Sequence, residues 1–375
     1  MRVLNRLTWI WILLAACEGP QPAVETDVDG PRGADALGDG SHPDQPASQP
    51  ASQPASQRDS GDTMSDDDRP DASTDGALSL SDRVIDDEAP DQALDPSDLG
   101  SDAQTADVPR PPRRIELLLD AEAGLNVPDG MARLPDGRLL LANEGTSQIL
   151  AFDVAALTLT PFMGRADGLI APEEVALGPD GSVYVSDDAA GAVFRRLPDG
   201  TVVRIVSRAD GFESPEGVTV RPDGTVFVAD EKAHIIAAMG PDGSNLRAVA
   251  GAAEGVFAPE GLAAGRDGSV FATDDRRGGV MKIDPQDRVS VFSSVMVSPL
   301  PEGICITAAG EIYTTDNGGA ASAVQRFSAN GELLERIEMP VPRGSLAGLM
   351  VLPDGSIIVA VFVSRMRHEL WRVSP

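Results

Sequence analysis

The chain has 375 residues and a formal net charge of −29, from 59 acidic and 30 basic residues. This excess of negative charge argues against nucleic acid as a partner, because phosphates require a basic face. Only three histidines and two cysteines occur in the whole chain, which nearly excludes catalysis or zinc binding by clustered histidines and thiols.

The first 17 residues predict export and lipid modification. Two arginines precede an apolar run, residues 7–16, which as a helix would span about 15 Å, half of a bilayer core. This is the pattern of a signal peptide. The tetrapeptide LAAC, ending at Cys17, resembles the lipobox of bacterial lipoproteins. We therefore expect lipidation of Cys17 and anchoring to a membrane. The expected location is the bacterial cell envelope, outside the cytoplasm, at the outer membrane or cell surface. An ordinary secretory signal is the alternative.

Residues 18–112 predict a disordered linker. They contain no aromatic residue, 23 acidic and 5 basic residues, and the repeat QPASQPASQPASQ. Such a segment buries too little apolar surface to offset its conformational entropy. The aspartates of DTMSDDDRPDASTDG lack the spacing of an EF-hand loop, so we interpret them as solvated charge.

The remaining residues, 113–375, contain one unit repeated six times. The stretch PEGVTVRPDGTVFVAD from Pro215 aligns with five others, which begin at Pro128, Pro172, Pro259, Pro301 and Leu346. The intervals of 42 to 45 residues are typical of stacked or radial repeats, whose single units cannot bury their own apolar face.

Each unit predicts four β-strands. In the third unit GVTV leads through the turn RPDGT to VFVAD, and HIIAAM and NLRAVA follow. Pro-Asp-Gly suits a tight turn, because proline presets φ, aspartate bonds the local backbone and glycine accepts a positive φ. Six such units predict an all-β fold, a six-bladed β-propeller. The last unit supplies only three strands, so we expect RIELLLD, from Arg114, to complete the last blade and close the ring.

An acidic residue stands at the start of the first strand in five units. These residues are Asp129, Glu173, Glu216, Glu260 and Glu302, and the sixth unit has Ala347. First strands line the channel of a propeller, so we predict a ring of carboxylates at one mouth. A second series follows fourteen residues later, at Asn143, Asp187, Asp230, Asp274 and Asp316. We interpret this second series as structural, fastening the following turn.

The predicted ring requires electrostatic compensation. Two carboxylates about 5 Å apart repel by roughly 3 kcal/mol at an effective dielectric of 20. The ring must therefore take up protons, pair with arginines or backbone groups, or bind a cation. Calcium accepts six to eight oxygen ligands in flexible geometry. We predict a divalent cation, Ca²⁺, held by the five ring residues, and pairing within the protein stays open as the alternative.

The units PEGVTVRPDGTVFVAD and PDGMARLPDGRLLLAN resemble those of the senescence-marker-protein/gluconolactonase family, the regucalcin-like six-bladed propellers, over about residues 114–375. They are also close to NHL repeats and to strictosidine-synthase-like propellers. The resemblance implies a divalent cation, often calcium, which polarises a lactone carbonyl and activates water at the channel mouth. The family's aspartate in a PDGM-like stretch matches Asp129. In this sequence that stretch lies in the first unit rather than a late one, and no unit offers the family's asparagine ligand.

Two functions remain in view. The first is a lipid-anchored, cation-dependent lactone or ester hydrolase that acts as a monomer, with Asp129 and Glu216 as catalytic residues. The second is a non-catalytic NHL-like propeller that presents a surface to a protein or another ligand. If the protein is an enzyme, we expect an open channel mouth that binds a cation. If it is a scaffold, we expect the acids at the mouth to be paired within the protein.

Two further residues carry chemistry outside the ring. Glu174 replaces a glycine of the other acid-bearing units, and both a functional role and evolutionary drift are open for it. Cys305 lies on a predicted inner strand. We expect a small buried side chain there, since no adjacent base is visible that would make it a nucleophile.

Overall fold

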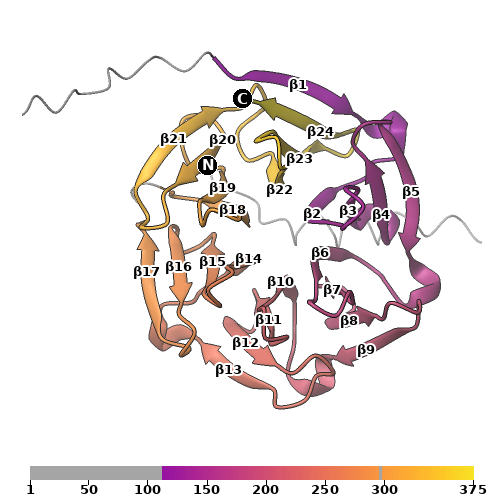
Figure 1. The fold of residues 1–375 in the computed structure, drawn as a ribbon, viewed down its shortest axis with the longest axis vertical. Helices are drawn as coiled ribbons and strands as arrows, with labels where there is room; N and C mark the ends of the chain where they lie inside the picture. Colours follow the sequence, from indigo (N-terminus) through magenta and orange to yellow (C-terminus); the bar gives the residue numbers. More distant parts are fainter. Residues whose placement is uncertain (1–111, 295–297) are drawn as a thin grey trace, which may run out of the picture. The chain divides into compact units, whose positions relative to one another are not determined.

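The computed structural model describes residues 112–294 and 298–375, which form a six-bladed β-propeller (Figure 1). These residues belong to the unit Leu99–Pro375. The predicted signal peptide, the lipidation site Cys17 and nearly all of the predicted linker lie outside the described residues. Within the described ranges, no helix is long and apolar enough to cross a membrane.

Each blade is a four-stranded antiparallel sheet. Blade one contains β2 (Pro128–Arg133), β3 (Leu139–Asn143), β4 (Gln148–Asp153) and β5 (Thr158–Met163). Blade two contains β6 (Pro172–Leu177), β7 (Val183–Asp187), β8 (Ala192–Arg196) and β9 (Val202–Val206). Blade three contains β10 (Pro215–Val220), β11 (Val226–Asp230), β12 (Ile235–Met239) and β13 (Arg247–Ala250).

The second half of the ring repeats this arrangement. Blade four contains β14 (Pro259–Ala264), β15 (Val270–Asp274), β16 (Val280–Ile283) and β17 (Val289–Ser293). Blade five contains β18 (Pro301–Ile306), β19 (Ile312–Asp316), β20 (Ala323–Phe327) and β21 (Leu333–Glu338). Blade six contains β22 (Leu346–Val351), β23 (Ile357–Ser364), β24 (Arg367–Ser374) and β1 (Arg114–Leu119). The predicted fold is therefore confirmed.

The ring closes through β1, as the sequence predicts. This strand pairs antiparallel with β24, Arg114 opposite Ser374, and Figure 1 shows the two strands side by side. The preceding residue, Arg113, makes a two-pronged contact with Glu335 of blade five, at 2.9 and 2.8 Å. The N-terminal segment thus joins the last two blades as well as completing one of them.

The apolar core lies between the blades. Both faces of a blade's middle strands are covered by its neighbours, which explains why β3, β7 and β11 are buried at every residue. Blades three and four share one such cluster, in which Phe227, Leu262 and Met281 are all buried. Because every blade needs two neighbours to bury its faces, the ring is one cooperative unit.

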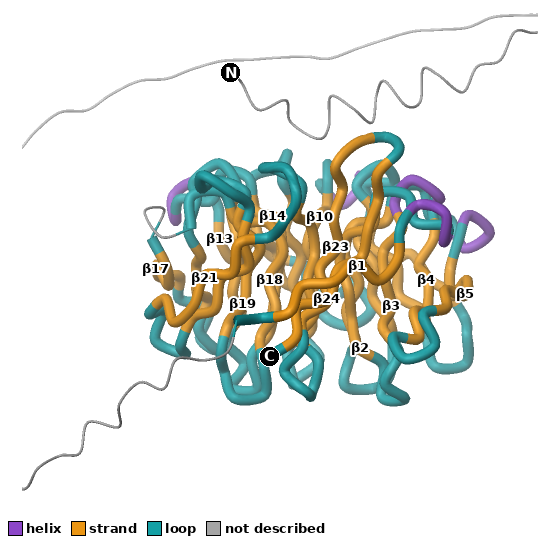
Figure 2. Tube along the Cα trace, turned by 90° about the horizontal axis from the view of Figure 1, so that it is seen from above, coloured by secondary structure: helices purple, strands orange, loops and turns teal. Residues whose placement is uncertain are grey.

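The propeller has two faces with different structure. Inner strands begin on the mouth face, which is the face that carries the short 3-10 helices in Figure 2. These helices are η1 (Ala121–Ala123), η2 (Glu144–Thr146), η3 (Arg165–Asp167), η4 (Arg208–Asp210) and η5 (Ala252–Glu254). The opposite face, here called the turn face, carries the Pro-Asp-Gly turns that join first to second and third to fourth strands.

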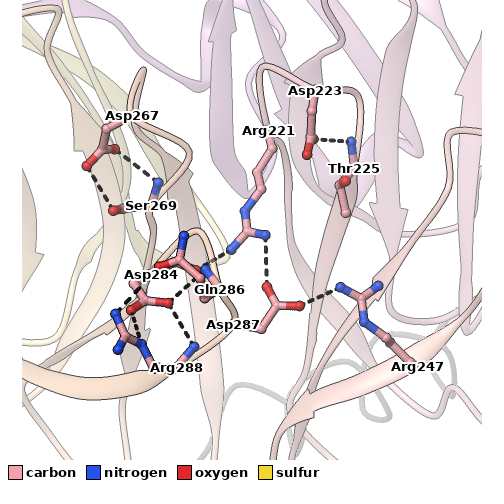
Figure 3. A network of polar contacts seen from close by, with 10 residues as sticks. All are labelled: Arg221, Asp223, Thr225, Arg247, Asp267, Ser269, Asp284, Gln286, Asp287 and Arg288. Atoms are coloured by element: carbon pink, nitrogen blue, oxygen red, sulfur yellow. Dashed lines mark hydrogen bonds and ion pairs between the residues drawn. The ribbon is translucent and has the colours of Figure 1, made fainter.

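On the turn face an arginine network joins blades three and four (Figure 3). The buried Arg221 guanidinium lies 4.3 Å from the ring centre of Phe227. It donates to Asp287 Oδ1 at 2.8 Å and to the carbonyl oxygen of Asp284 at 2.8 Å. Arg247 donates to the other oxygen of Asp287 at 2.5 Å. The turn that follows β16 is thereby fastened to the neighbouring blade.

Candidate functional site: the acidic mouth of the channel

The Asp/Asn series at the ends of the second strands holds the loops of the mouth face. Asp230 accepts backbone N–H groups from Glu213 at 2.7 Å, Ser214 at 3.0 Å and Ala233 at 2.9 Å. Asp187 accepts three N–H groups at the equivalent positions of its blade. Each buried carboxylate therefore fixes the approach to an inner strand, and the structural interpretation of this series is confirmed.

The inner-strand acids lie immediately beyond these loops, at the start of each first strand. Glu173 is 7 % exposed, and Glu216 keeps a little more accessible surface. Burial raises the pKa of Glu173 well above its usual value, and the charges of Glu144, Glu216, Asp188 and Asp129 raise it further. Burial also raises the pKa of Glu216, with Glu260 as the largest charge contribution. The structure thus brings Asp129, Glu173, Glu216 and Glu260 within electrostatic reach of one another.

A second group of acids, which the sequence reasoning missed, reinforces this ring. Glu144, Asp188 and Glu231 directly follow the structural Asn or Asp of their blades and raise the pKa of Glu173, of Glu216 or of both. Burial and the adjacent Asp187 raise the pKa of Asp188 itself to about 6. The sequence contains a pattern that could have predicted this second group: an acidic residue recurs fifteen positions after the ring acid in four units.

Some ring members are held by hydrogen bonds within the fold. Asp129 Oδ1 accepts the backbone N–H of Gly348 from blade six, at 3.1 Å. Glu302 Oε2 accepts Nδ2 of Asn317 at 3.0 Å. Ser214 Oγ donates to Glu216 Oε1 at 3.3 Å. These bonds orient three carboxylates without neutralising them.

Basic residues do not neutralise the two ring acids that the structure buries most clearly. In the described part of the chain, neither Glu173 nor Glu216 forms an ion pair with lysine, arginine or histidine. Lys232 is connected to Glu216 only through a serine. Its Nζ donates to Ser214 Oγ at 3.3 Å, and Ser214 Oγ donates to Glu216 Oε1. Pairing with arginine, one of the alternatives open from the sequence, therefore does not compensate these two carboxylates.

The donor set suits a hard cation in chemistry but is not gathered at one point. Every candidate ligand at the mouth is a carboxylate or amide oxygen, which Ca²⁺ and Mg²⁺ prefer. Asp188 is 4 % exposed, and its Oδ1 is buried without a hydrogen-bond partner. Across the residues that the structure describes, however, no three His, Cys, Asp or Glu side chains are grouped as a metal site. Binding one ion would require these carboxylates to turn toward each other.

Cys305 lies in the channel wall on β18, 8 % exposed. Burial raises the pKa of its thiol to about 11, so the thiolate that nucleophilic catalysis requires is scarce at neutral pH. This agrees with the expectation of a small buried side chain.

Comparison with known proteins finds a family that the first four blades resemble. Residues 119–298, which span the first four blades, match the model of the SMP-30/Gluconolactonase/LRE-like region. The chain matches none of the curated proteins with which it was compared. Among solved structures, a gluconolactonase from Xanthomonas campestris has 18% identity and a TM-score of 0.57, over 70% of this chain and 89% of that chain.

Two other solved structures have the same fold at lower identity. A calcium-binding protein, regucalcin, from Agrobacterium tumefaciens has 15% identity and a TM-score of 0.51, over 70% of this chain and 95% of that chain. A virginiamycin B lyase from Staphylococcus aureus has 13% identity and a TM-score of 0.54, over 70% of this chain and 99% of that chain. At these identities the likeness shows the fold, and the family match shows that the first four blades are similar to the SMP-30/Gluconolactonase/LRE-like region.

Proposed function

We propose that the acidic mouth is the active site of a divalent-cation-dependent hydrolase that opens a lactone or a related ester. The observation that carries the proposal is the burial of the Glu173 and Glu216 carboxyls without a basic partner among the described residues. Groups with strongly raised pKa values at a channel opening are typical of functional sites. The similarity of residues 119–298 to the SMP-30/Gluconolactonase/LRE-like region supports the same reaction class.

The mouth residues would serve two roles, and Asp129 and Glu216 take part in both. Asp129, Glu173, Glu216, Glu260 and Glu302 would hold the cation, with Ca²⁺ favoured by their oxygen chemistry. When bound, it would polarise the carbonyl of the substrate. The orphan Oδ1 of Asp188 would gain a compensating charge nearby. The five ring residues come from five different blades, so binding would also tie the blades together.

Glu216 is suited to move the proton. Its raised pKa makes it a stronger base than a solvent-exposed glutamate. As a carboxylate it takes a proton from the attacking water, whose oxygen bonds to the carbonyl carbon. The protonated carboxyl then returns that proton to the ring oxygen as the acyl C–O bond breaks. The product is a hydroxy acid, and Glu216 is regenerated. Asp129, fixed by the Gly348 N–H, would orient the reacting group from blade one, two blades away from Glu216.

A panel of γ- and δ-lactones, assayed by proton release with calcium and with chelator, tests this function. We expect hydrolysis with calcium, strong loss in chelator, and a fall in kcat of at least about a hundredfold in Glu216→Gln. Glu311→Gln, on the turn face, is the matched control and should retain activity. Absence of hydrolysis across the panel, or activity that Glu216→Gln leaves intact, would favour the alternative of a binding scaffold.

We further propose that the propeller is anchored to the bacterial cell envelope through lipidated Cys17. The support is the LAAC tetrapeptide after an apolar run, followed by a long acidic linker sequence. Cys17→Ser should move the protein from the membrane to the soluble fraction while lactone hydrolysis persists. A variant that fractionates with membranes as the parent does would disprove the anchor.

A further inference from the structure

Blade six interrupts the acidic mouth with apolar side chains. It has Ala347 at the position of the ring acid and Val361 at the position of the structural Asp or Asn. At the next position, Phe362 replaces the acid or amide that every other blade carries there: Glu144, Asp188, Glu231, Asp275 and Asn317. All three positions at which the other blades present polar groups to the mouth are therefore apolar in blade six.

The contacts of Phe362 place it beside blade one. Its ring is stacked on that of His368, with centroids 5.4 Å apart and planes at 15°. His368 Nδ1 accepts the backbone N–H of Val127 at 3.0 Å, and its Nε2 donates to the carbonyl oxygen of Arg365 at 3.0 Å. Val127 precedes Asp129 by two residues. The aromatic ring is thus held next to the part of the carboxylate ring that blade one supplies.

The repeat gives the same direction. In blade one, Glu144 is near enough to Glu173 of blade two for its charge to raise the pKa of that carboxyl. The same step from blade six leads from Phe362 to Asp129 of blade one. Phe362 is partly exposed, so an aromatic surface remains accessible where an acid would face the ring in another blade.

A projecting hairpin extends this apolar sector above the mouth. β23 and β24 have eight residues each, whereas the second strands of the other blades have five. Figure 2 shows the hairpin standing above the other loops of the mouth face. At its tip Met366 is 86 % exposed, and the neighbouring Arg367 donates to Glu369 Oε1 at 2.6 Å. We call Phe362 and Met366 the blade-six wall.

We propose that the blade-six wall binds an apolar chain on the substrate, so that the mouth prefers alkyl-substituted lactones to bare or polyhydroxylated ones. This inference rests on the proposed hydrolase function. A lactone ring bound beside Asp129 can direct a substituent toward Phe362, which adjoins it. Removal of an alkyl chain from water is favourable, whereas hydroxyl groups against the same wall would lose hydrogen bonds to water. A cation held by the acids of the other five blades requires no ligand from blade six.

Three six-membered lactones test the inference on the full chain with calcium: δ-valerolactone, δ-decalactone, which adds an alkyl chain, and glucono-δ-lactone. Each kcat/KM is divided by the uncatalysed rate constant of the same lactone. The value for δ-decalactone should exceed the other two by at least about tenfold. Equal values for the three lactones, or the highest value for glucono-δ-lactone, would overturn the inference and leave the proposed hydrolase intact.

Variants assign the preference to blade six. The readout is the ratio of kcat/KM for δ-decalactone to that for δ-valerolactone, because this ratio cancels a general loss of activity. Phe362→Asn, which introduces the residue that blade five has there, should lower the ratio by about fivefold or more, and Phe362→Leu should largely keep it. Met366→Ser should lower it by about twofold, and this variant decides if Phe362→Asn fails to fold.

Two control variants test the other candidates on the mouth face. Phe257→Asn removes an exposed aromatic side chain from blade four, and Arg365→Gln removes a charge from the tip of the hairpin. Both should leave the ratio unchanged. If either lowers the ratio as much as Phe362→Asn does, the chain is bound elsewhere or by charge, and the assignment to the blade-six wall is wrong.

Calorimetry separates this inference from the proposed reaction. In full-length Glu216→Gln with calcium, δ-decalactone should bind at least about tenfold more tightly than δ-valerolactone, and adding Phe362→Asn should remove most of the difference. If the parent protein hydrolyses no lactone, this result would still support the wall while the reaction class is wrong. Equal affinities for the two lactones, or no binding of either, would contradict the wall whatever the hydrolytic activity.

Discussion

The two faces of the propeller treat their carboxylates in opposite ways. On the turn face, the backbone N–H of Ser182 donates to Asp180, and that of Thr225 donates to Asp223, which lowers the pKa of each carboxyl. On the mouth face, burial and neighbouring acids raise the pKa values of Glu173, Glu216 and Asp188. Both faces are acidic, and the structural aspartates of the mouth face also accept backbone N–H groups, but burial and neighbouring charges dominate at Glu173 and Glu216.

This difference separates acids that build the fold from acids that are available to a ligand. The turn-face aspartates contribute to stability as anions, because the native state binds their charged form better than the unfolded chain does. The mouth acids destabilise the native state when they are anions, because burial and neighbouring negative charges favour their neutral form over the charged form. Such a local conflict between stability and residue choice is typical of functional sites.

The largest expected effect is on the turn face. Asp287→Ala removes the only charged partner that the structure gives Arg221 among the described residues; Arg221 is 5 % exposed, so its buried charge loses its counterion. We expect a loss of about 4 kcal/mol in the free energy of unfolding, measured by denaturant titration. Arg247→Ala, which removes the exposed arginine from the same carboxylate, should cost about 0.5 kcal/mol. Equal losses in the two variants would show that burial does not set the strength of this network.

A somewhat smaller loss is expected where a carboxylate holds a mouth-face loop. Asp230→Ala leaves three backbone N–H groups without their acceptor and should destabilise the propeller by about 3 kcal/mol. Asp242→Ala, in an exposed turn where one N–H is bonded, should destabilise the propeller much less. A small effect at Asp230 would place it with the mouth acids rather than with the structural series.

The pH dependence of stability should reveal both kinds of acid. Folding raises the pKa values of Glu173, Glu216 and Asp188, so the native state binds more protons than the unfolded state between about pH 4 and 7. Stability in chelator should therefore increase by about 2 kcal/mol as the pH falls from 8 to 5. Below about pH 4 the turn-face aspartates lose their advantage, and stability should fall. Thermal melts that decline steadily from pH 8 to 5 would contradict this assignment.

The smallest expected change in stability is that of Glu216→Gln, and whether it stabilises or destabilises the propeller is informative. In chelator, Glu216→Gln should stabilise the propeller by about 1 kcal/mol, because one repelling charge is removed from the ring. On the turn face, Glu311→Gln breaks the contact with Arg326 and should destabilise by about 0.5 kcal/mol. Destabilisation by both substitutions would mean that Glu216 has a compensating partner in the fold.

The sequence predicts the fold almost completely because its signals are local and repeated. The Pro-Asp-Gly turns, such as those at Asp180 and Asp223, mark the strand pairs, and the number of repeated units sets the number of blades. The closing strand β1 is also predictable, since blade six lacks one strand. These features depend on residues close together in the chain.

The site is only partly predictable because it forms between blades. The ring acids could be placed at one mouth from the repeat alone. The coupling of Glu173 to Glu144, or of Glu216 to Asp188, depends on how neighbouring blades turn their loops toward each other. The position of Glu174 opposite Gly130 likewise follows from the contact of two strands that are far apart in sequence. No local pattern encodes these contacts.

Thermal melting of the full chain at neutral pH, with calcium and with chelator, tests most directly whether the mouth acids await a cation. If they do, calcium at a hundredfold excess over its Kd should stabilise the native state by about 2.7 kcal/mol, and chelator should reverse the gain. Glu216→Gln should reduce the gain, and Asp187→Asn, in the structural series, should leave it intact. Identical curves with calcium and chelator, together with a Glu216→Gln variant destabilised in both, would contradict the account.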